Sequence, residues 1–153
     1  ELHDLDNPEE IPAVPKYIEE WESPFGPEAK QYPLQAMGHH YMGRVHSTHA
    51  NSDWLKEAFP QRAFINELDA QARGIADGDT VKVYNGRGAT ILPCRVTKRI
   101  LPGVINIPQG AWWASSEDGI DRQGSVNVLT SERWTPYAHG TAQHTMMVEV
   151  EKV

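Results

Sequence analysis

Four of the seven histidines in the sequence fall within one short segment, residues 39–49. Imidazoles this close together can bind zinc, but no cysteine or carboxylate completes a familiar ligand spacing, and Arg44 would repel a metal ion. Arginine with Ser47 and Thr48 suits an anion, because a guanidinium group binds two phosphate oxygens and hydroxyl and imidazole groups donate further hydrogen bonds. A zinc site and a solvated polar loop remain alternatives. The candidate binding residues in this segment are His39, His40, Arg44, His46 and Ser47, with His49 beside them.

A second set of polar side chains follows in the last third of the sequence. Asn127, Gln143 and His144 could present paired donors and acceptors to the edge of a heterocycle. The commoner role of such residues is to cap turns. The adjacent Trp112 and Trp113 follow a glycine and could wall a ligand pocket or belong to the core. These residues therefore form a candidate second half of the site.

Composition excludes several classes of function. The net charge is −7 and lysines and arginines form no block, so nucleic acid is not an expected partner. No stretch approaches the roughly 20 apolar residues of a spanning helix, so no direct membrane insertion is expected and the chain should be soluble. The single cysteine, Cys94, excludes an internal disulfide and an iron–sulfur cluster ligated within the chain, and should be a small core residue. No nucleophile elbow and no glycine-rich nucleotide loop occurs.

The sequence divides into two parts with different character. Residues 1–31 form an acidic, proline-rich segment, called the arm below, in which steps such as Asn7-Pro8 and Ser23-Pro24 disfavour helix. We expect an extended arm that links this chain to a larger protein. Residues 32–153 carry short apolar runs separated by turn signals, the pattern of a small barrel or sandwich. Strands are expected at 32–37, 63–65, 80–84, 89–97, 104–107, 126–129 and 145–153, and short helices at 53–58 and 66–75.

Particular residues mark the ends of these elements. Asn66 can cap a helix that Gly74 ends in the left-handed conformation. Asn85-Gly86 predicts a hairpin, because this pair accepts the positive φ angles of tight turns. Pro93 cannot donate a ladder hydrogen bond, so we place it at a sheet edge or a bulge. The chemistry-bearing residues therefore fall in loops between short strands.

Several of these segments resemble, in order, the C-terminal domain of dimethyl sulfoxide reductase-type catalytic subunits. They are Tyr32-Pro33-Leu34, Gly38-His39-His40-Tyr41, Gly43-Arg44-Val45-His46-Ser47, Ile65-Asn66, Asp69-Ala70, Arg73-Gly74-Ile75 and Asp77-Gly78-Asp79. The order continues through Asn85-Gly86-Arg87-Gly88, Pro102-Gly103-Val104, Gly110-Ala111-Trp112, Asn127-Val128-Leu129-Thr130 and Gln143-His144-Thr145. The resemblance extends from about residue 32 to residue 153 and is weaker in the arm.

The resemblance implies a mainly β fold, a double-psi β-barrel of the aspartate-decarboxylase-like type with two or three short helices. In that family the domain holds one pyranopterin guanine dinucleotide of the bis-molybdopterin guanine dinucleotide (bis-MGD) molybdenum cofactor. By motif match the binding residues would be His39, His40, Arg44, His46, Ser47, Asn127, Gln143 and His144, with no metal ligand and no catalytic residue among them.

The resemblance also implies partners and a location. The family reaction is reduction of an S-oxide or N-oxide, and the metal-ligating residue and the iron–sulfur cluster belong to earlier domains. We therefore expect partners in those remaining domains and in iron–sulfur and membrane-anchor subunits, at the periplasmic or cell-envelope face, and no turnover by this chain alone. The alternative is a stand-alone barrel that binds a ligand or protein and has no redox role.

Overall fold

Six short strands close into a barrel in the computed structural model, which describes residues 9, 11–114, 116–135 and 138–153. The strands are β1 (Leu34–Met37), β2 (Ala63–Ile65), β3 (Thr80–Tyr84), β4 (Ala89–Val96), β5 (Val104–Asn106) and β6 (Met146–Lys152). The described helices are α1 (Asp53–Ala58) and α2 (Glu67–Ala72), with 3-10 turns η1 (Pro27–Lys30) and η2 (Val126–Leu129). The predicted mainly β class with two or three short helices is confirmed.

The strands are joined in an order that differs from their order in the chain. Around the barrel the order is β1-β5-β2-β4-β3-β6, and it closes on itself. The pairs β1–β5 and β2–β4 are parallel, and the other four pairs are antiparallel. Each parallel partner is therefore reached by a crossover and not by a hairpin. Interleaved parallel pairs within a closed six-stranded barrel agree with the predicted double-psi arrangement.

Alternating apolar residues fill the inside of the barrel. In β3 the side chains of Val81 and Val83 are fully buried while their neighbours are at least partly exposed, as period-two patterning requires. Complete burial of a side chain of this size stabilises the fold by roughly 1.5–3 kcal/mol. Cys94 belongs to the same core, as predicted, and burial raises the pKa of its thiol. Its thiol donates to the carbonyl of Ala76, so this cysteine has a packing role.

The predicted end signals of α2 are confirmed. The side chain of Asn66 accepts a hydrogen bond from the backbone N–H of Leu68 at 2.9 Å, which caps the first turn. Gly74 has φ +65°, the left-handed conformation that ends a helix. These two residues fix the short helix between β2 and β3.

The β3–β4 hairpin forms as predicted, but by a different turn. Neither Asn85 nor Gly86 has a positive φ; instead the Asn85 side chain accepts from the N–H of Arg87 at 3.0 Å, an Asx turn. Pro93, predicted at a sheet edge or a bulge, lies where β4 is paired on one side only, with Thr80 of β3, although the barrel as a whole is closed. Pairing of β4 with β2 begins at Cys94, so the missing donor of Pro93 lies where that ladder ends.

The predicted strand at 126–129 is wrong, since this segment is the 3-10 helix η2. The alternation of Val126 and Val128 resembles a strand. The buried residues, however, are Val126 and Leu129, which are three apart and therefore share one face of a 3-10 helix. Packing of η2 against β4 thus decides its conformation.

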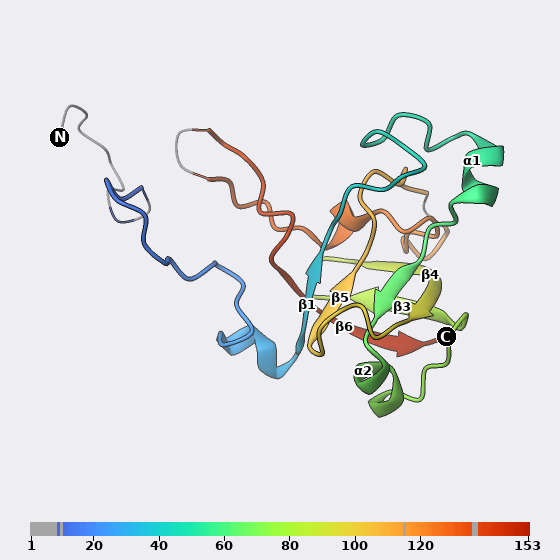
Figure 1. The fold of residues 1–153 in the computed structure, drawn as a ribbon, viewed down its shortest axis with the longest axis horizontal. Coiled ribbons are helices and arrows are strands. Elements are labelled where there is room, and N and C mark those ends of the chain that lie inside the picture. The colour runs from blue at the N-terminus through green and yellow to red at the C-terminus, as the bar shows by residue number, and fades with distance from the viewer. Residues whose placement is uncertain (1–8, 10, 115, 136–137) are drawn as a thin grey trace.

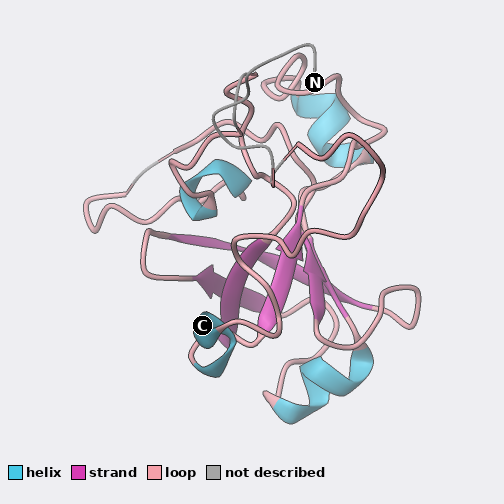
Figure 2. Cartoon of the chain, turned by 90° about the vertical axis from the view of Figure 1, so that its left-hand side faces the viewer, coloured by secondary structure: helices cyan, strands magenta, loops and turns pink. Residues whose placement is uncertain are grey.

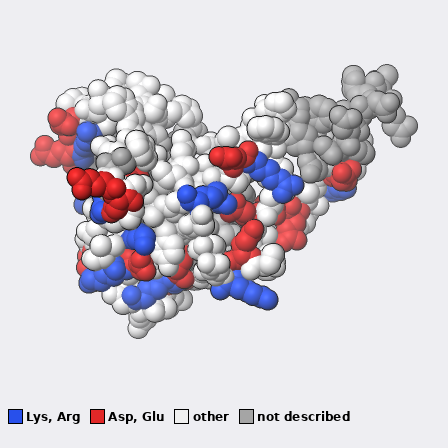
Figure 3. Space-filling view, turned by 180° about the vertical axis from the view of Figure 1, so that it is seen from behind, with Lys and Arg blue, Asp and Glu red and all other residues white. Residues whose placement is uncertain are grey.

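The long loops gather at one end of the barrel. Figure 1 shows much of residues 38–62 and 107–130 beyond one end of the strands, with α2 and the turn near residue 100 at the other end, and Figure 2 shows most of the loops gathered on one side of the strands. From behind, charged side chains surround the lower part of the molecule, whereas much of the loop end on that face is uncharged (Figure 3). None of the described helices is both long and apolar enough to cross a membrane.

The described part of the arm extends away from the barrel at its start (Figure 1) and contacts the barrel further on through acidic side chains. Glu20 accepts from the Gln35 side chain at 3.0 Å. Glu22 accepts from Arg87 and from the backbone N–H of Met147, both at 2.9 Å. The arm contains η1 but is otherwise without helix or strand over its described residues. The Asn7-Pro8 step lies outside the described residues, and a domain boundary near residue 31 remains a prediction.

Candidate functional site

A clamp formed by residues 107–112 holds the histidine loop (residues 38–50) in place. The guanidinium group of Arg44 donates from Nε to the carbonyl of Gln109 at 2.9 Å and from Nη2 to that of Pro108 at 3.2 Å. Nη2 also donates to the side chain of Gln61 at 2.5 Å, and burial lowers the pKa of Arg44 from its ordinary value. The planar fork of arginine suits these carbonyl acceptors. Arg44 therefore ties its own loop to the segment after β5.

The tightest part of the clamp is the approach of Gly110 to His46. His46 has φ +49° and Gly110 has φ +90°. A Cβ atom on Gly110 would lie 1.8 Å from the carbonyl oxygen of His46, so only glycine fits. Beside this contact the indole N–H of Trp112 donates to the carbonyl of Ser47 at 2.9 Å. The tryptophan predicted to wall a pocket instead binds the backbone of the histidine loop.

The imidazoles in this loop have defined neighbours. The rings of His40 and His46 meet edge to face at 5.0 Å between centroids. The amide nitrogen of Gln109 lies 3.4 Å from Nδ1 of His46, and an amide nitrogen can only donate, so a neutral His46 carries its proton on Nε2. His39 donates from Nδ1 to the side-chain oxygen of Asn106. In their neutral forms the two rings would present opposite tautomers, with Nε2 of His46 as a donor and Nε2 of His39 as an acceptor.

The second half of the predicted set lies on two segments at the same end of the barrel. Asn127 is exposed on η2, whose carbonyl at Leu129 accepts from the side chains of Asn85 and Arg87. Gln143 and His144 line a cavity of about 380 Å³ together with arm residues. The carbonyl of Gln143 is 3.8 Å from where a Cβ of Gly38 would stand. The segment before β6 therefore reaches the start of the histidine loop.

The structure does not bring the whole predicted set into one cavity. Arg44 and His49 line a different cavity of about 380 Å³, which also includes Lys56 and Arg122. Since the Nε and Nη2 donors of Arg44 already bind protein acceptors, its geometry favours a positioning role over direct contact with a phosphate. The contacts of the individual residues with a ligand remain predictions.

Replacement of Arg44 by lysine should loosen the histidine loop. A lysine keeps the charge but cannot reproduce the fork of donors that reaches Pro108, Gln109 and Gln61. We expect a loss of about 1 kcal/mol in the free energy of unfolding, and faster amide exchange at Thr48, whose N–H bonds within the loop. Arg95→Lys, at an exposed ion pair with Asp77, is the matched control. Equal effects of the two substitutions would contradict the clamp.

Sequence reasoning missed two glutamines that organise the site. Gln109 is buried, and Gln61 donates to the carbonyls of Pro108 and Gly124 at 2.8 and 2.9 Å. Both follow a proline, in Pro60-Gln61 and Pro108-Gln109. The repeated Pro-Gln pair could have indicated these two residues, because a proline restricts the backbone just before a side chain that reaches across to other loops.

The geometry gives no support to a zinc site in the histidine loop. Within the described ranges no three His, Cys, Asp or Glu side chains come together as a metal ion would require. The rings of His39 and His46 instead bond to the amide side chains of Asn106 and Gln109. The loop therefore presents hydrogen-bonding groups.

Loops that present imidazole and amide groups at one end of a barrel are suited to binding a ligand, and the comparisons with known proteins show which family of domains this is. Residues 34–147 match the family model described as "Molydopterin dinucleotide binding domain". The dimethyl sulfoxide reductase DmsA of Escherichia coli (strain K12) is 47% identical over 143 residues, 94% of this chain and 18% of that protein. The dimethyl sulfoxide/trimethylamine N-oxide reductase of Rhodobacter capsulatus is 39% identical over 153 residues, with 94% and 18% covered.

A solved structure agrees on the fold. Acetylene hydratase from Pelobacter acetylenicus superposes with a TM-score of 0.77 at 19% identity, covering 97% of this chain and 23% of that chain. This chain belongs to the molybdopterin dinucleotide-binding domain family, in its dimethyl sulfoxide reductase-type branch. It spans about a fifth of the length of the curated relatives it matches, and so corresponds to one domain of such larger proteins.

Proposed function

We propose that this chain holds one pyranopterin guanine dinucleotide of a bis-MGD molybdenum cofactor within a larger S-oxide or N-oxide reductase. The observation that carries the proposal is the clamped histidine loop, which holds exposed imidazoles in place and whose first residue, Gly38, lies next to the carbonyl of Gln143. Relatives named as dimethyl sulfoxide and trimethylamine N-oxide reductases support the substrate class. The stand-alone barrel without a redox role is not favoured.

The donors and acceptors of the described site fit a pterin dinucleotide. His46 offers an N–H donor and His39 an acceptor, while Gln143 and Asn127 carry both kinds of group, as the mixed edge of a pterin requires. His40, Ser47 and His144 complete the proposed set. The molybdenum cofactor would supply the two-electron transfer. The residues of this chain bind and orient the dinucleotide and exclude water from it.

The remaining proposals concern the whole protein. Its metal-ligating residue and iron–sulfur cluster would lie in other domains, since Cys94 is the sole cysteine here and is committed to the barrel core. Partners would be those domains together with iron–sulfur and membrane-anchor subunits. By family likeness the location would be the periplasmic or cell-envelope face. The chain alone should reduce no oxide.

Binding of the dinucleotide is the direct test. Native mass spectrometry of the chain with molybdopterin guanine dinucleotide should give a 1:1 complex. His46→Ala removes one neutral hydrogen-bond donor and should weaken binding about tenfold. His139→Ala removes an exposed histidine outside the proposed set and should leave affinity unchanged. Failure of the unaltered chain to bind the dinucleotide would refute the proposed function.

A further inference from the structure

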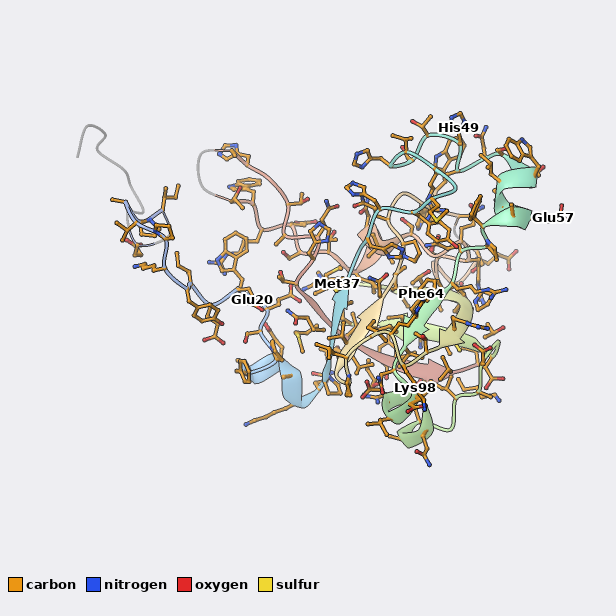
Figure 4. All side chains as sticks on the ribbon, viewed as in Figure 1. Glu20, Met37, His49, Glu57, Phe64 and Lys98 are labelled. Carbon is orange, nitrogen blue, oxygen red and sulfur yellow. The ribbon has the colours of Figure 1, made fainter. Side chains whose placement is uncertain are left out.

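The cavity that contains Gln143 and His144 is completed by the arm. Its lining combines residues 18–21 of the arm with residues 141–145, which lead into β6. The cavity volume of about 380 Å³ is within the range of sites for small organic ligands. Figure 4 shows Glu20 on the arm close to the barrel, on the side of β1. The arm thus supplies one wall of the candidate site and is more than a linker.

Electrostatics restricts which part of a dinucleotide this cavity can accept. Its lining includes the carboxylates of Glu19 and Glu20 and no lysine or arginine, although the guanidinium of Arg133 stacks on the Trp21 ring. A diphosphate placed here would meet like charge, which is unfavourable. A neutral heterocycle with N–H donors would instead find acceptors. The cavity therefore suits a base and not the phosphates.

Two side chains that line the cavity, Glu20 and Trp21, are held in place and suit a flat base. Glu20 is held by the Gln35 amide, which bonds to Oε1 and leaves the other carboxylate oxygen without a described partner. Trp21 lines the cavity, and the guanidinium of Arg133 lies 4.3 Å from its ring centroid, which restrains the ring and leaves stacking of a base to the other face. The carboxylate can accept two parallel N–H bonds at the edge of a base stacked on the indole.

We propose that Glu20 and Trp21 recognise the 2-amino-4-oxopyrimidine edge, which presents adjacent ring N–H and amino donors. This proposal rests on the proposed function, because guanine and pterin both carry this edge and both occur in the dinucleotide. Adenine lacks the ring N–H, and hypoxanthine lacks the amino group. Glu20 is thus assigned to base selection, with Gln143 and His144 on the opposite wall.

Two matched pairs of small ligands test the proposal by calorimetry on the full 153-residue chain. Guanosine monophosphate should bind about tenfold tighter than inosine monophosphate, and pterin about tenfold tighter than lumazine, because each second ligand lacks the amino group. If only guanosine monophosphate is preferred over its partner, the cavity binds guanine. If only pterin is preferred over lumazine, the cavity binds pterin. Equal affinities within both pairs, or no binding of any of the four, would overturn the proposal.

Variants separate this proposal from the proposed function. Glu20→Gln keeps the size of the side chain but turns one acceptor into a donor, and should abolish the preference for the amino-bearing ligand. Glu28→Gln makes the same change on η1, outside the cavity, and should retain it. If Glu20→Gln keeps the preference, the base-reading role is wrong, while unimpaired binding of the whole dinucleotide would leave the proposed function standing.

Discussion

Substitution of Gly110 by alanine should disrupt the histidine loop and with it cofactor binding. The new Cβ would stand 1.8 Å from the carbonyl oxygen of His46, a distance at which one of the two backbones must move. The left-handed φ of +90° adds strain of about 1–2 kcal/mol, and the overlap adds about 1–3 kcal/mol. We expect the free energy of unfolding to fall by about 3 kcal/mol and dinucleotide binding to be lost.

Gly119→Ala is the matched control for this substitution. Gly119 has φ +75°, but a Cβ built on it meets nothing within 4 Å. Denaturant unfolding of the two variants therefore separates backbone strain, which both share, from the overlap, which only Gly110 has. Equal destabilisation by both variants would show that the approach of the two loops does not matter.

The sequence was a good guide to elements with local signals. The strands at 63–65 and 80–84 and the helix at 53–58 have the predicted bounds, because patterning, caps and turns act within a few residues. The strand predicted at 126–129 was wrong because the apolar residues Val126 and Val128 are too few to distinguish a strand from a helical turn. Burial of Leu129 together with Val126 favours the 3-10 helix. Local periodicity predicts an element only where tertiary packing agrees with it.

The candidate site was predictable in its residue types but not in their roles. Arg44 was recognised as a cation that suits an anion, yet its donors reach the carbonyls of Pro108 and Gln109, more than 60 positions away in sequence. Such a contact depends on the crossover that places β1 beside β5. Spacing within the histidine loop carries no information about it. The family resemblance predicted the cofactor, whereas the contacts of Arg44 with the segment after β5 are seen only in the three-dimensional structure.

Under the proposed function, the two cavities would favour different parts of a dinucleotide. One contains Arg44, Lys56 and Arg122, whereas the other contains Glu19 and Glu20. The acidic lining would disfavour a phosphate in the cavity that we assign to the base. The arm is needed for this division, because both carboxylates come from it. If the base binds there, selectivity depends on the part of the sequence with the weakest structural signal.

Asp121 holds the loop that leads into η2, and its removal should be the most destabilising change outside the barrel core. The carboxylate is completely buried and accepts from Thr90 Oγ1 at 2.6 Å, Ser125 N–H at 2.7 Å and Ala114 N–H at 2.9 Å. Alanine would leave these three donors without their acceptor, at about 1–3 kcal/mol each. Because water can enter the space, we expect a net loss of about 4 kcal/mol in the free energy of unfolding.

A second measurement decides whether Asp121 also acts on the site. Asp118→Ala, in the same loop, removes an exposed partner of Arg122 and should change stability far less. In Asp121→Ala the amide of Ser125 should exchange rapidly, and η2, which carries Asn127, should lose its anchor on β4. Dinucleotide affinity should then fall by about as much as in Asn127→Ala, because both substitutions withdraw the same amide. If Asp121→Ala stays folded and loosens η2 but binds the dinucleotide with unchanged affinity, the position of Asn127 does not matter to the ligand. Asn127 would then be removed from the proposed binding residues.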